Sequence, residues 1–320
     1  VSHEESTGGE EETAQEAGRS ADASHTVGPD SPETATEPSS TVKSGSSHPT
    51  ETSNSHLNSA HGDQAAAEEQ KALGVAFIEA VIAPMDYELN QRWWGWRSND
   101  IVNVTDNVNN FQLGVLEVTR RTTVALAERI SRTGVTAAFD PNVEQAMNWF
   151  MIKADRYWFP SAESKYKEGL EELNAYKKRL EKGTAPFYVR TDNLIPLLAA
   201  YADLLGSCEE NLVKFTEEDG DPVSFFTADD YFFYAKGVAT AMVGILEAVA
   251  QDFALTVDTR RGMELLHHAI ESCHHAIEID PLIITNSPLD GILANHRANM
   301  AAPISHARFY LEVLVKTLST

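Results

Sequence analysis

The chain has 320 residues, a net charge of −23 and two cysteines, Cys208 and Cys273. Such an acidic chain is repelled by the phosphate backbone of nucleic acids and by anionic lipids, so we expect neither as a partner that binds through charge. Two cysteines are too few for a disulfide framework or a cysteine-rich metal site, although this pair could form one disulfide in an oxidising compartment.

The first 66 residues differ in composition from the rest of the chain. They contain no Phe, Tyr or Trp, and their large aliphatic residues are limited to Val1, Val27, Val42 and Leu57. A polar segment of this kind cannot bury enough apolar surface to offset the entropy of the chain. The composition therefore predicts a disordered, acidic N-terminal tether over residues 1–66 and a single folded domain over residues 67–320.

Within the predicted domain, apolar residues recur almost throughout at the helical period. The expected helices cover about residues 64–94, 109–131, 141–152, 161–182, 191–215, 227–254, 259–280 and 287–318. The sixth of these is apolar on most sides, so we expect it at the centre of the fold. No alternating strand pattern competes. The sequence predicts an all-α bundle of about eight helices behind the tether.

Two helix starts carry strong local signals. Asp140 followed by Pro141 fits an N-cap and a first helical position. Thr227 followed by Asp230 fits the start of the sixth helix. These positions allow the capping predictions to be checked one by one.

Five blocks of this sequence match, in the same order along the chain, five blocks of a pattern that is known from other proteins. They are 98–100 with 109–115 (Ser-Asn-Asp and Asn-Asn-Phe-Gln-Leu-Gly-Val), 159–164 (Phe-Pro-Ser-Ala-Glu-Ser), 187–194 (Phe-Tyr-Val-Arg-Thr-Asp-Asn-Leu), 233–237 (Phe-Tyr-Ala-Lys-Gly) and 291–296 (Gly-Ile-Leu-Ala-Asn-His). Over about residues 75–315 the chain resembles the bacterial family called domain of unknown function 2333. The resemblance implies an α-helical protein of the cell envelope, usually with an N-terminal membrane anchor and without an assigned activity.

These observations lead to one expected function. We expect a non-catalytic envelope protein, on the periplasmic side of the inner membrane, that acts through contacts with a protein partner. It would reach the membrane only through an anchor that this chain does not contain. No phosphate-binding glycine loop, nucleophile elbow or His-Glu-x-x-His motif is present, so we expect neither an enzyme nor a cofactor.

A polar cluster supplies the alternative function. Asn295, His296 and Asn299 lie in an otherwise apolar helix, and buried amides and imidazoles need hydrogen-bonding partners. They could clamp the loop 98–110 onto the C-terminal helix, or they could line a polar pocket that binds a small ligand. The expected partners in either arrangement are Asn99, Asp100, Arg190, Asp192 and Asn193.

A row of histidines and glutamates is the candidate metal site. His267, Glu271, His274 and Glu278 are spaced i, i+4, i+7 and i+11, which places them on one helix face. Imidazole and carboxylate groups on one face can bind zinc or another transition metal. The alternative is a solvated face with local His–Glu pairs.

Three tryptophans and two short basic runs complete the candidates. Trp93, Trp94 and Trp96 could contact a partner or the membrane interface, or they could close the core at a helix end. The basic runs are the pair Arg120-Arg121 and residues 177–179. We interpret both runs as solvated helix faces.

Overall fold

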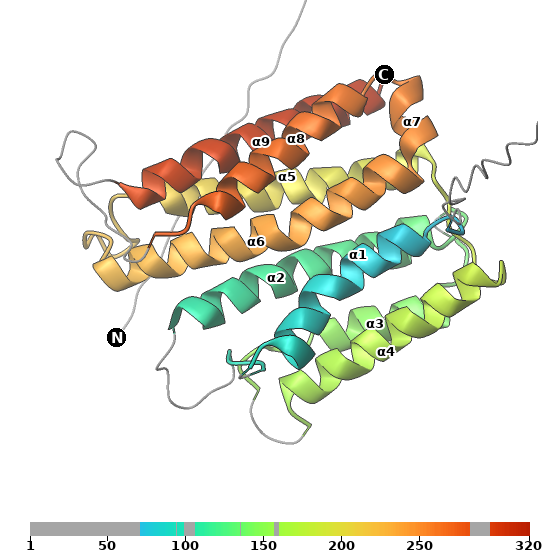
Figure 1. The fold of residues 1–320 in the computed structure, drawn as a ribbon, viewed down its shortest axis with the longest axis horizontal. Coiled ribbons are helices and arrows are strands. Elements are labelled where there is room, and N and C mark those ends of the chain that lie inside the picture. The colour runs from blue at the N-terminus through green and yellow to red at the C-terminus, as the bar shows by residue number, and fades with distance from the viewer. Residues whose placement is uncertain (1–70, 94, 99–105, 135, 157–159, 282–294) are drawn as a thin grey trace, which may run out of the picture. The chain divides into compact units, whose positions relative to one another are not determined.

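The computed structural model describes residues 71–93, 95–98, 106–134, 136–156, 160–281 and 295–320. Within these ranges the regular elements are nine α-helices and two short π-helical segments, with no β-strand (Figure 1). The helices are α1 Val75–Asp86, α2 Asp106–Ala125, α3 Pro141–Phe150, α4 Ala162–Glu181, α5 Thr191–Val213, α6 Phe225–Asp252, α7 Ala254–Thr259, α8 Met263–Glu278 and α9 His296–Leu318, and the π-helical segments are η1 Tyr87–Gln91 and η2 Leu126–Ile130. The predicted all-α fold is confirmed. The tether predicted over residues 1–66 lies outside the described ranges.

Local capping explains where several helices begin. The side chain of Asp140 accepts a hydrogen bond from the backbone N–H of Asn142 at 3.1 Å, and Pro141 occupies the first helical position, as predicted. The sixth helix begins earlier than expected, because the Ser224 hydroxyl, rather than Thr227, serves as its N-cap and accepts from the Thr227 N–H at 3.1 Å. Capping residues can thus be found from sequence to within a few positions.

Other boundaries differ more from the prediction. Helix α1 begins at Val75, because Gly74 has a φ of 84° and stops a helix from running through it, and the expected start near residue 64 lies outside the described residues. A short additional helix, α7, appears because the chain breaks at Phe253, whose φ of −103° and ψ of 15° end α6. The last helix begins after Asn295, and its expected start at residue 287 lies outside the described residues.

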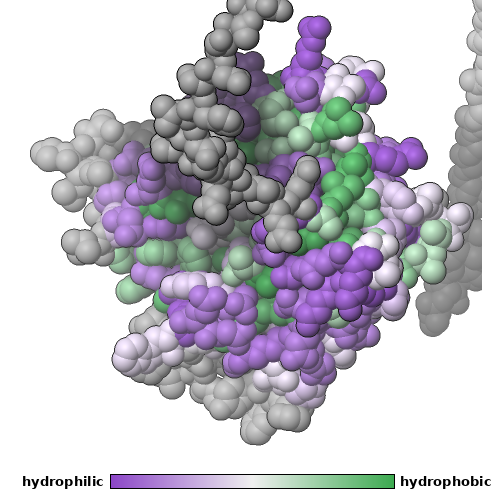
Figure 2. All heavy atoms as spheres, turned by 45° about the vertical axis from the view of Figure 1, so that its right-hand side comes forward, coloured by the Kyte–Doolittle hydropathy of each residue, from purple (hydrophilic) through white to green (hydrophobic). Residues whose placement is uncertain are grey.

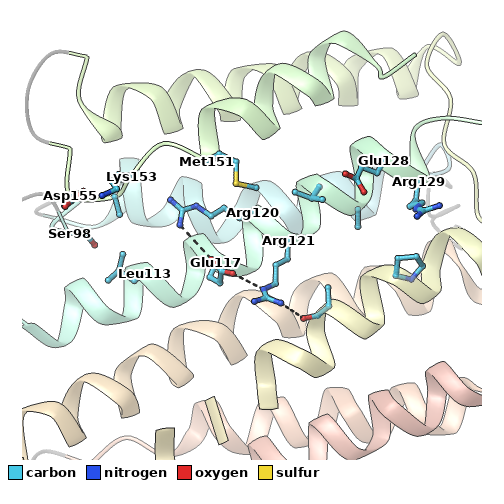
Figure 3. Close-up of a pocket in the computed structure, with 15 residues that line it drawn as sticks. Ser98, Leu113, Glu117, Arg120, Arg121, Glu128, Arg129, Met151, Lys153 and Asp155 are labelled. Carbon is cyan, nitrogen blue, oxygen red and sulfur yellow. Dashed lines mark hydrogen bonds and ion pairs between the residues drawn. The ribbon is translucent and has the colours of Figure 1, made fainter. Parts of the chain in front are cut away.

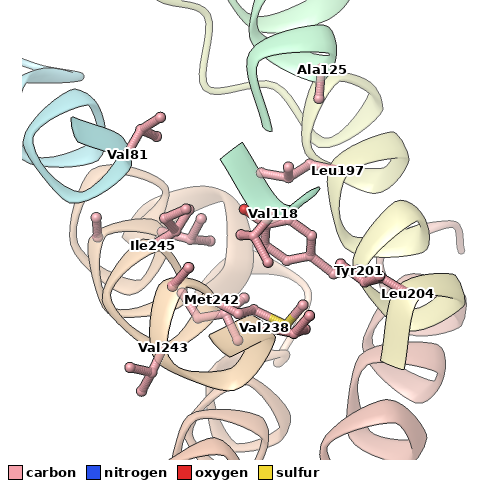
Figure 4. Close-up of a cluster of buried hydrophobic side chains, with 14 of the residues drawn as sticks. Val81, Val118, Ala125, Leu197, Tyr201, Leu204, Val238, Met242, Val243 and Ile245 are labelled. Atoms are coloured by element: carbon pink, nitrogen blue, oxygen red, sulfur yellow. The ribbon is translucent and has the colours of Figure 1, made fainter. Parts of the chain in front are cut away.

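Helix α6 is central, as its composition predicts. It packs against α1, α2, α5, α8 and α9. Figure 4 shows the core around it, where Val81 of α1, Val118 of α2 and Tyr201 of α5 surround Met242 and Ile245 of α6. All five side chains are buried, so the burial of apolar surface around α6 holds α1, α2 and α5 together.

The apolar character of α6 also gives it the composition of a membrane span. Of the helices in the described ranges, only α6 is long and apolar enough to cross a membrane by length and composition. Of the apolar 18-residue stretch of α6 that meets this criterion, 67% is buried inside the structure, so a position in the core explains the composition of the helix. On the face drawn in Figure 2, hydrophilic side chains, in purple, surround a narrower band of hydrophobic ones, in green.

Helix α2 changes neighbours along its length. In its first half Gly114 lies against the backbone of Tyr234 and Val238 on α6. In its second half the hydroxyl groups of Thr122 and Tyr201 are 2.6 Å apart, which places this part of α2 beside α5. The close crossing with α6 and the contact with α5 fix where the side chains of α2 point.

Candidate functional site

A groove opens between α2, the first half of α5 and the segment that follows α3 (Figure 3). Its volume is about 790 Å³. The residues of α2 and η2 that line it extend from Leu113 to Arg129, which is roughly 24 Å of helix at a rise of 1.5 Å per residue. The groove is therefore long, and it combines charged with apolar side chains.

At the centre of the groove, Glu117 lies between two guanidinium groups (Figure 3). The Nε of Arg121 donates a hydrogen bond to Oε1 of Glu117 at 2.9 Å, and Nη1 of Arg120 lies 3.8 Å from Oε2. Glu117 precedes the arginines by three and four residues, so the helical period brings the three side chains together. We call these residues the Arg–Glu–Arg cluster. It carries one net positive charge, although the whole chain carries −23.

Backbone carbonyl groups of neighbouring elements fix both arginines. Nε of Arg120 donates to the carbonyl of Phe150 at 2.7 Å, and its Nη2 donates to that of Ile152 at 2.8 Å. These carbonyls lie at the C-terminal end of α3, where a helix presents free acceptors and the negative end of its dipole. Nη1 of Arg121 donates to the carbonyl of Ala200 on α5 at 3.1 Å. The guanidiniums are thus held in place in this conformation.

The segment after α3, which forms one wall of the groove, is also held in place by α4. The hydroxyl of Tyr166 on α4 donates to the Ile152 carbonyl at 2.6 Å, and Trp96 packs edge-on against the Tyr166 ring. Burial raises the pKa of Tyr166 to about 12, so this phenol stays protonated and remains a donor. The same carbonyl therefore joins Arg120 of α2 to the core of the α3–α4 pair.

Charged side chains also mark the two ends of the groove. Lys153 and Asp155 lie at one end, and Glu128 and Arg129 lie at the other (Figure 3). Each end carries one positive and one negative charge, which cancel. The local surplus of positive charge is consequently confined to the Arg–Glu–Arg cluster at the centre.

Between the charges the walls are apolar. Leu113 and Val124 come from α2, Pro196 comes from α5 and Met151 follows α3. Met151 is 48% exposed, and its flexible thioether side chain can adapt to the shape of a bound molecule. A concave, mainly apolar site with a few fixed polar groups is typical of small-molecule binding.

The comparison with family models matches residues 43–221 and 216–319 to DUF2333, described as uncharacterized proteins conserved in bacteria. The chain belongs to this family. The resemblance inferred from the five sequence blocks is therefore confirmed. Neither the comparison with curated proteins nor the comparison with solved structures found a match. For this DUF2333 protein, chemistry has to be inferred from its geometry.

The structure separates the polar residues that the sequence groups together. Arg190 and Asp192 lie at the N-terminal end of α5, where Nε of Arg190 donates to Oδ1 of Asp192 at 2.9 Å, and Asn193 follows directly. The start of α9 lies at the other end of α5, where Nη2 of Arg297 donates to the carbonyl of Lys214 at 2.7 Å. An α5 of 23 residues separates its ends by roughly 35 Å. The described members of the expected cluster therefore lie in two distant groups.

Asn295 has a capping role at the start of α9. Its side-chain oxygen accepts a hydrogen bond from the backbone N–H of Ala298 at 2.9 Å. His296 is the first residue of the helix and is partly exposed, and Asn299 is exposed. The structure thus places Asn299 on the surface rather than in a buried network. The expected loop partners, Asn99 and Asp100, lie outside the described residues.

The candidate metal residues lie on an exposed face of α8. His267, Glu271, His274 and Glu278 are all exposed. Nε2 of His274 lies 2.9 Å from Oε1 of Glu247 on α6, which makes a His–Glu pair between two helices. In the part of the chain that the structure describes, no group of three or more His, Cys, Asp or Glu side chains is arranged to hold a metal ion. The four side chains therefore lie on a solvent-exposed face of α8.

The two described tryptophans of the predicted contact, Trp93 and Trp96, differ in exposure. Trp93 is 88% exposed, whereas Trp96 is buried and its Nε1–H donates to the carbonyl of Ala154 at 3.2 Å. Trp94 lies outside the described residues. Trp96 therefore closes the core, and Trp93 is exposed on the surface.

The two cysteines are free and buried. Burial raises the pKa of Cys208 and of Cys273 to about 12. Because the thiolate is the nucleophilic form, neither side chain is prepared for covalent catalysis at neutral pH.

Arg120 and Arg121 are the site residues that the sequence interpretation missed. It assigns them to a solvated face, but their side chains are only 22% and 32% exposed and both donate to backbone carbonyls. Glu117, at three and four residues before them, is the local signal for the cluster. The carbonyl acceptors come from α3 and α5, and no local pattern on α2 indicates them.

Proposed function

We propose that this protein is a non-catalytic binding protein of the bacterial cell envelope, and that its groove between α2 and α5 holds a small, largely apolar ligand. One observation carries the proposal: a groove of about 790 Å³ has apolar walls around guanidiniums that backbone carbonyls hold in place. This volume falls within the range of about 300–1,000 Å³ that is typical of small-molecule sites.

The lining of the groove supports binding rather than catalysis. The described residues that line it include no histidine or cysteine, which are common proton shuttles and nucleophiles in enzymes. Each of Arg120 and Arg121 makes two hydrogen bonds, to backbone carbonyls or to Glu117, which fix the guanidinium, so both serve as fixed charges. Fixed charges beside apolar walls select and orient a ligand.

The envelope location rests on the family. The resemblance to domain of unknown function 2333 implies an envelope protein, and we place this domain on the periplasmic side of the inner membrane. A membrane anchor would hold this domain at the membrane. A ligand-binding domain at that position would meet molecules that move between the membrane and the periplasm.

A second candidate function, contact with a protein partner, has an observation of its own. Phe215 is 81% exposed and Phe226 is 73% exposed, at the connection between α5 and α6. The N–H of Val223 donates to the Phe215 carbonyl at 3.0 Å, so this connection turns back on itself and brings the backbone of its two sides together. Exposed aromatic side chains are enriched in protein interfaces. Affinity capture of the anchored protein from its own membranes, beside a Phe215→Ser and Phe226→Ser double variant, tests this contact.

The groove is tested by titration calorimetry with decanol, a neutral molecule with one alkyl chain. We expect saturable binding at one site per chain. Ala200→Trp fills the groove from the α5 wall and should abolish it, whereas Leu255→Trp places the same side chain on an exposed position of α7 and should leave it unchanged. Binding that survives Ala200→Trp, or no saturable binding of decanol, decanoate or decylammonium, would contradict a ligand site here.

A further inference from the structure

We infer that the ligand of the groove is a single-chain amphiphile with an anionic head, a carboxylate or a phosphate, and that this head binds at the Arg–Glu–Arg cluster. The inference rests on the proposed function of the groove as a ligand site and adds the chemistry that the site selects.

The distribution of charge is the first argument. The cluster has two guanidiniums and one carboxylate, while each end of the groove has one positive and one negative charge and is neutral overall. The chain as a whole is strongly acidic and repels anions from most of its surface. An anion that enters the groove is therefore attracted to its centre, and an ammonium group is disfavoured there.

The remaining donors of the arginines are the second argument. Nη2 of Arg121 makes no hydrogen bond within the described part of the chain, because Arg121 donates to Glu117 through Nε and to Ala200 through Nη1. Nη1 of Arg120 lies 3.8 Å from the nearest Glu117 oxygen, which is longer than a hydrogen bond. These two groups can donate charge-assisted hydrogen bonds to one anionic head.

Fixed geometry is the third argument. Each arginine is already bound to a backbone carbonyl of another element, so it loses little side-chain freedom when an anion binds. Glu117 holds the two guanidiniums near each other and limits the net charge to one. A head with a single negative charge would balance the cluster.

The walls next to the cluster specify the rest of the ligand. Small side chains, Ala125 on α2 and Ala200 on α5, leave room beside the guanidiniums, and Val124, Pro196 and Met151 add apolar surface. An alkyl chain can lie along these walls and gain the free energy of removing its surface from water. The site therefore fits an apolar chain that ends in an anion.

The test compares decanoate, decanol and decylammonium, which share a chain and differ in the charge of the head. Calorimetric titration of the full chain should show decanoate binding at least about tenfold more tightly than decanol, because a hydrogen bond to a charged group is worth that factor or more. Decylammonium should bind more weakly than decanol.

Two variants are expected to change decanoate affinity in opposite directions. Arg121→Gln removes a guanidinium and should weaken decanoate binding about tenfold. Glu117→Gln removes the competing carboxylate and should tighten it. Neither should change decanol affinity more than about twofold, since decanol carries no charge. The matched control is Arg308→Gln, which removes an exposed arginine that also pairs with two glutamates, Glu209 in the second half of α5 and Glu312 on α9, none of which lines the groove.

The outcomes separate this inference from the proposed function. Equal affinities for decanoate and decanol, with both lost in Ala200→Trp, would overturn the anionic head and leave the ligand site standing. Absence of binding by all three molecules would overturn both. If Arg121→Gln fails to fold by circular dichroism, Glu117→Gln decides alone, and unchanged or weaker decanoate binding in that variant would overturn the inference. Binding of the protein to anionic vesicles without binding of decanoate would also overturn it.

Discussion

The carboxylate of Asp252 accepts a hydrogen bond from the backbone N–H of Phe77 at 2.8 Å. Asp252 is the last residue of α6, and Phe77 lies in the first turn of α1. The residue at the N-cap position of α1 is Gly74, which has no side chain to accept this hydrogen bond. A carboxylate from another helix thus replaces the N-cap, and it also lies at the positive end of the α1 dipole.

Removing this acceptor should destabilise the protein. Asp252→Ala leaves the Phe77 N–H without its partner and should lower the free energy of unfolding by about 0.5–2 kcal/mol, the usual cost of losing an N-cap. Asp252→Asn keeps a side-chain oxygen and should cost less. Urea denaturation of the two variants measures both effects, and equal losses would show that the charge matters and the acceptor does not.

The same carboxylate should contribute a pH dependence. Burial raises the pKa of Asp252 above its ordinary value of 3.8, against the opposing effect of the hydrogen bonds from the N–H groups of Phe77 and Gly74. The folded state therefore holds this proton more tightly than the unfolded state does, and stability falls as the pH rises through the raised pKa. The stability of the unmodified protein relative to Asp252→Asn should decrease as the pH rises above the ordinary carboxyl pKa of 3.8. An increase there would show that the hydrogen bonds outweigh burial.

Asn295 should behave as a helix cap that is independent of the far end of α5. Asn295→Ala should cost about 0.5–2 kcal/mol, and Asn295→Ser, which keeps an oxygen for the Ala298 N–H, should cost less. The effects of Asn295→Ala and Arg190→Ala should add, because distant sites rarely couple. A double-mutant cycle by chemical denaturation measures the coupling. A coupling energy above about 1 kcal/mol would support the single polar cluster that the sequence suggests.

The fold follows from local patterns to a large extent. Helical periodicity predicts the all-α class, and the apolar surface of α6 predicts its central position, because a helix that is apolar all round has to be buried. Asp140 and Pro141 mark a helix start because their effect is local. Gly74 and Phe253 change boundaries through backbone dihedral angles that the surrounding structure imposes.

The site could not be predicted to the same extent. Asn295 and Arg190 are compatible as hydrogen-bonding partners by residue type, but their separation depends on the direction in which α9 lies along α5, and that direction is a property of the tertiary fold. Arg120 and Arg121 are polar residues on a helix, and polarity alone assigns them to the surface. Only the carbonyl groups of α3 and α5 reveal them as the centre of a groove.

Two glycines on α6 give a last prediction, with opposite signs. A Cβ at Gly237 would overlap the backbone oxygen of Phe111 on α2, whereas a Cβ at Gly244 would meet no atom within 4 Å. Gly237→Ala should therefore force α2 and α6 apart and lower the free energy of unfolding by about 1–3 kcal/mol. Gly244→Ala should raise it by up to about 1 kcal/mol, because alanine favours the helix.

The same pair of variants connects the helix crossing to the groove. Because α2 carries the Arg–Glu–Arg cluster, a displaced α2 moves the guanidiniums away from their carbonyl partners on α3 and α5. Gly237→Ala should thus weaken decanoate binding as well as stability, and Gly244→Ala should leave binding unchanged. Thermal and chemical denaturation, followed by calorimetric titration of the folded variants, measure both effects. If Gly237→Ala retained full stability, the two helices would have room to separate, and the close crossing would not be what positions the groove.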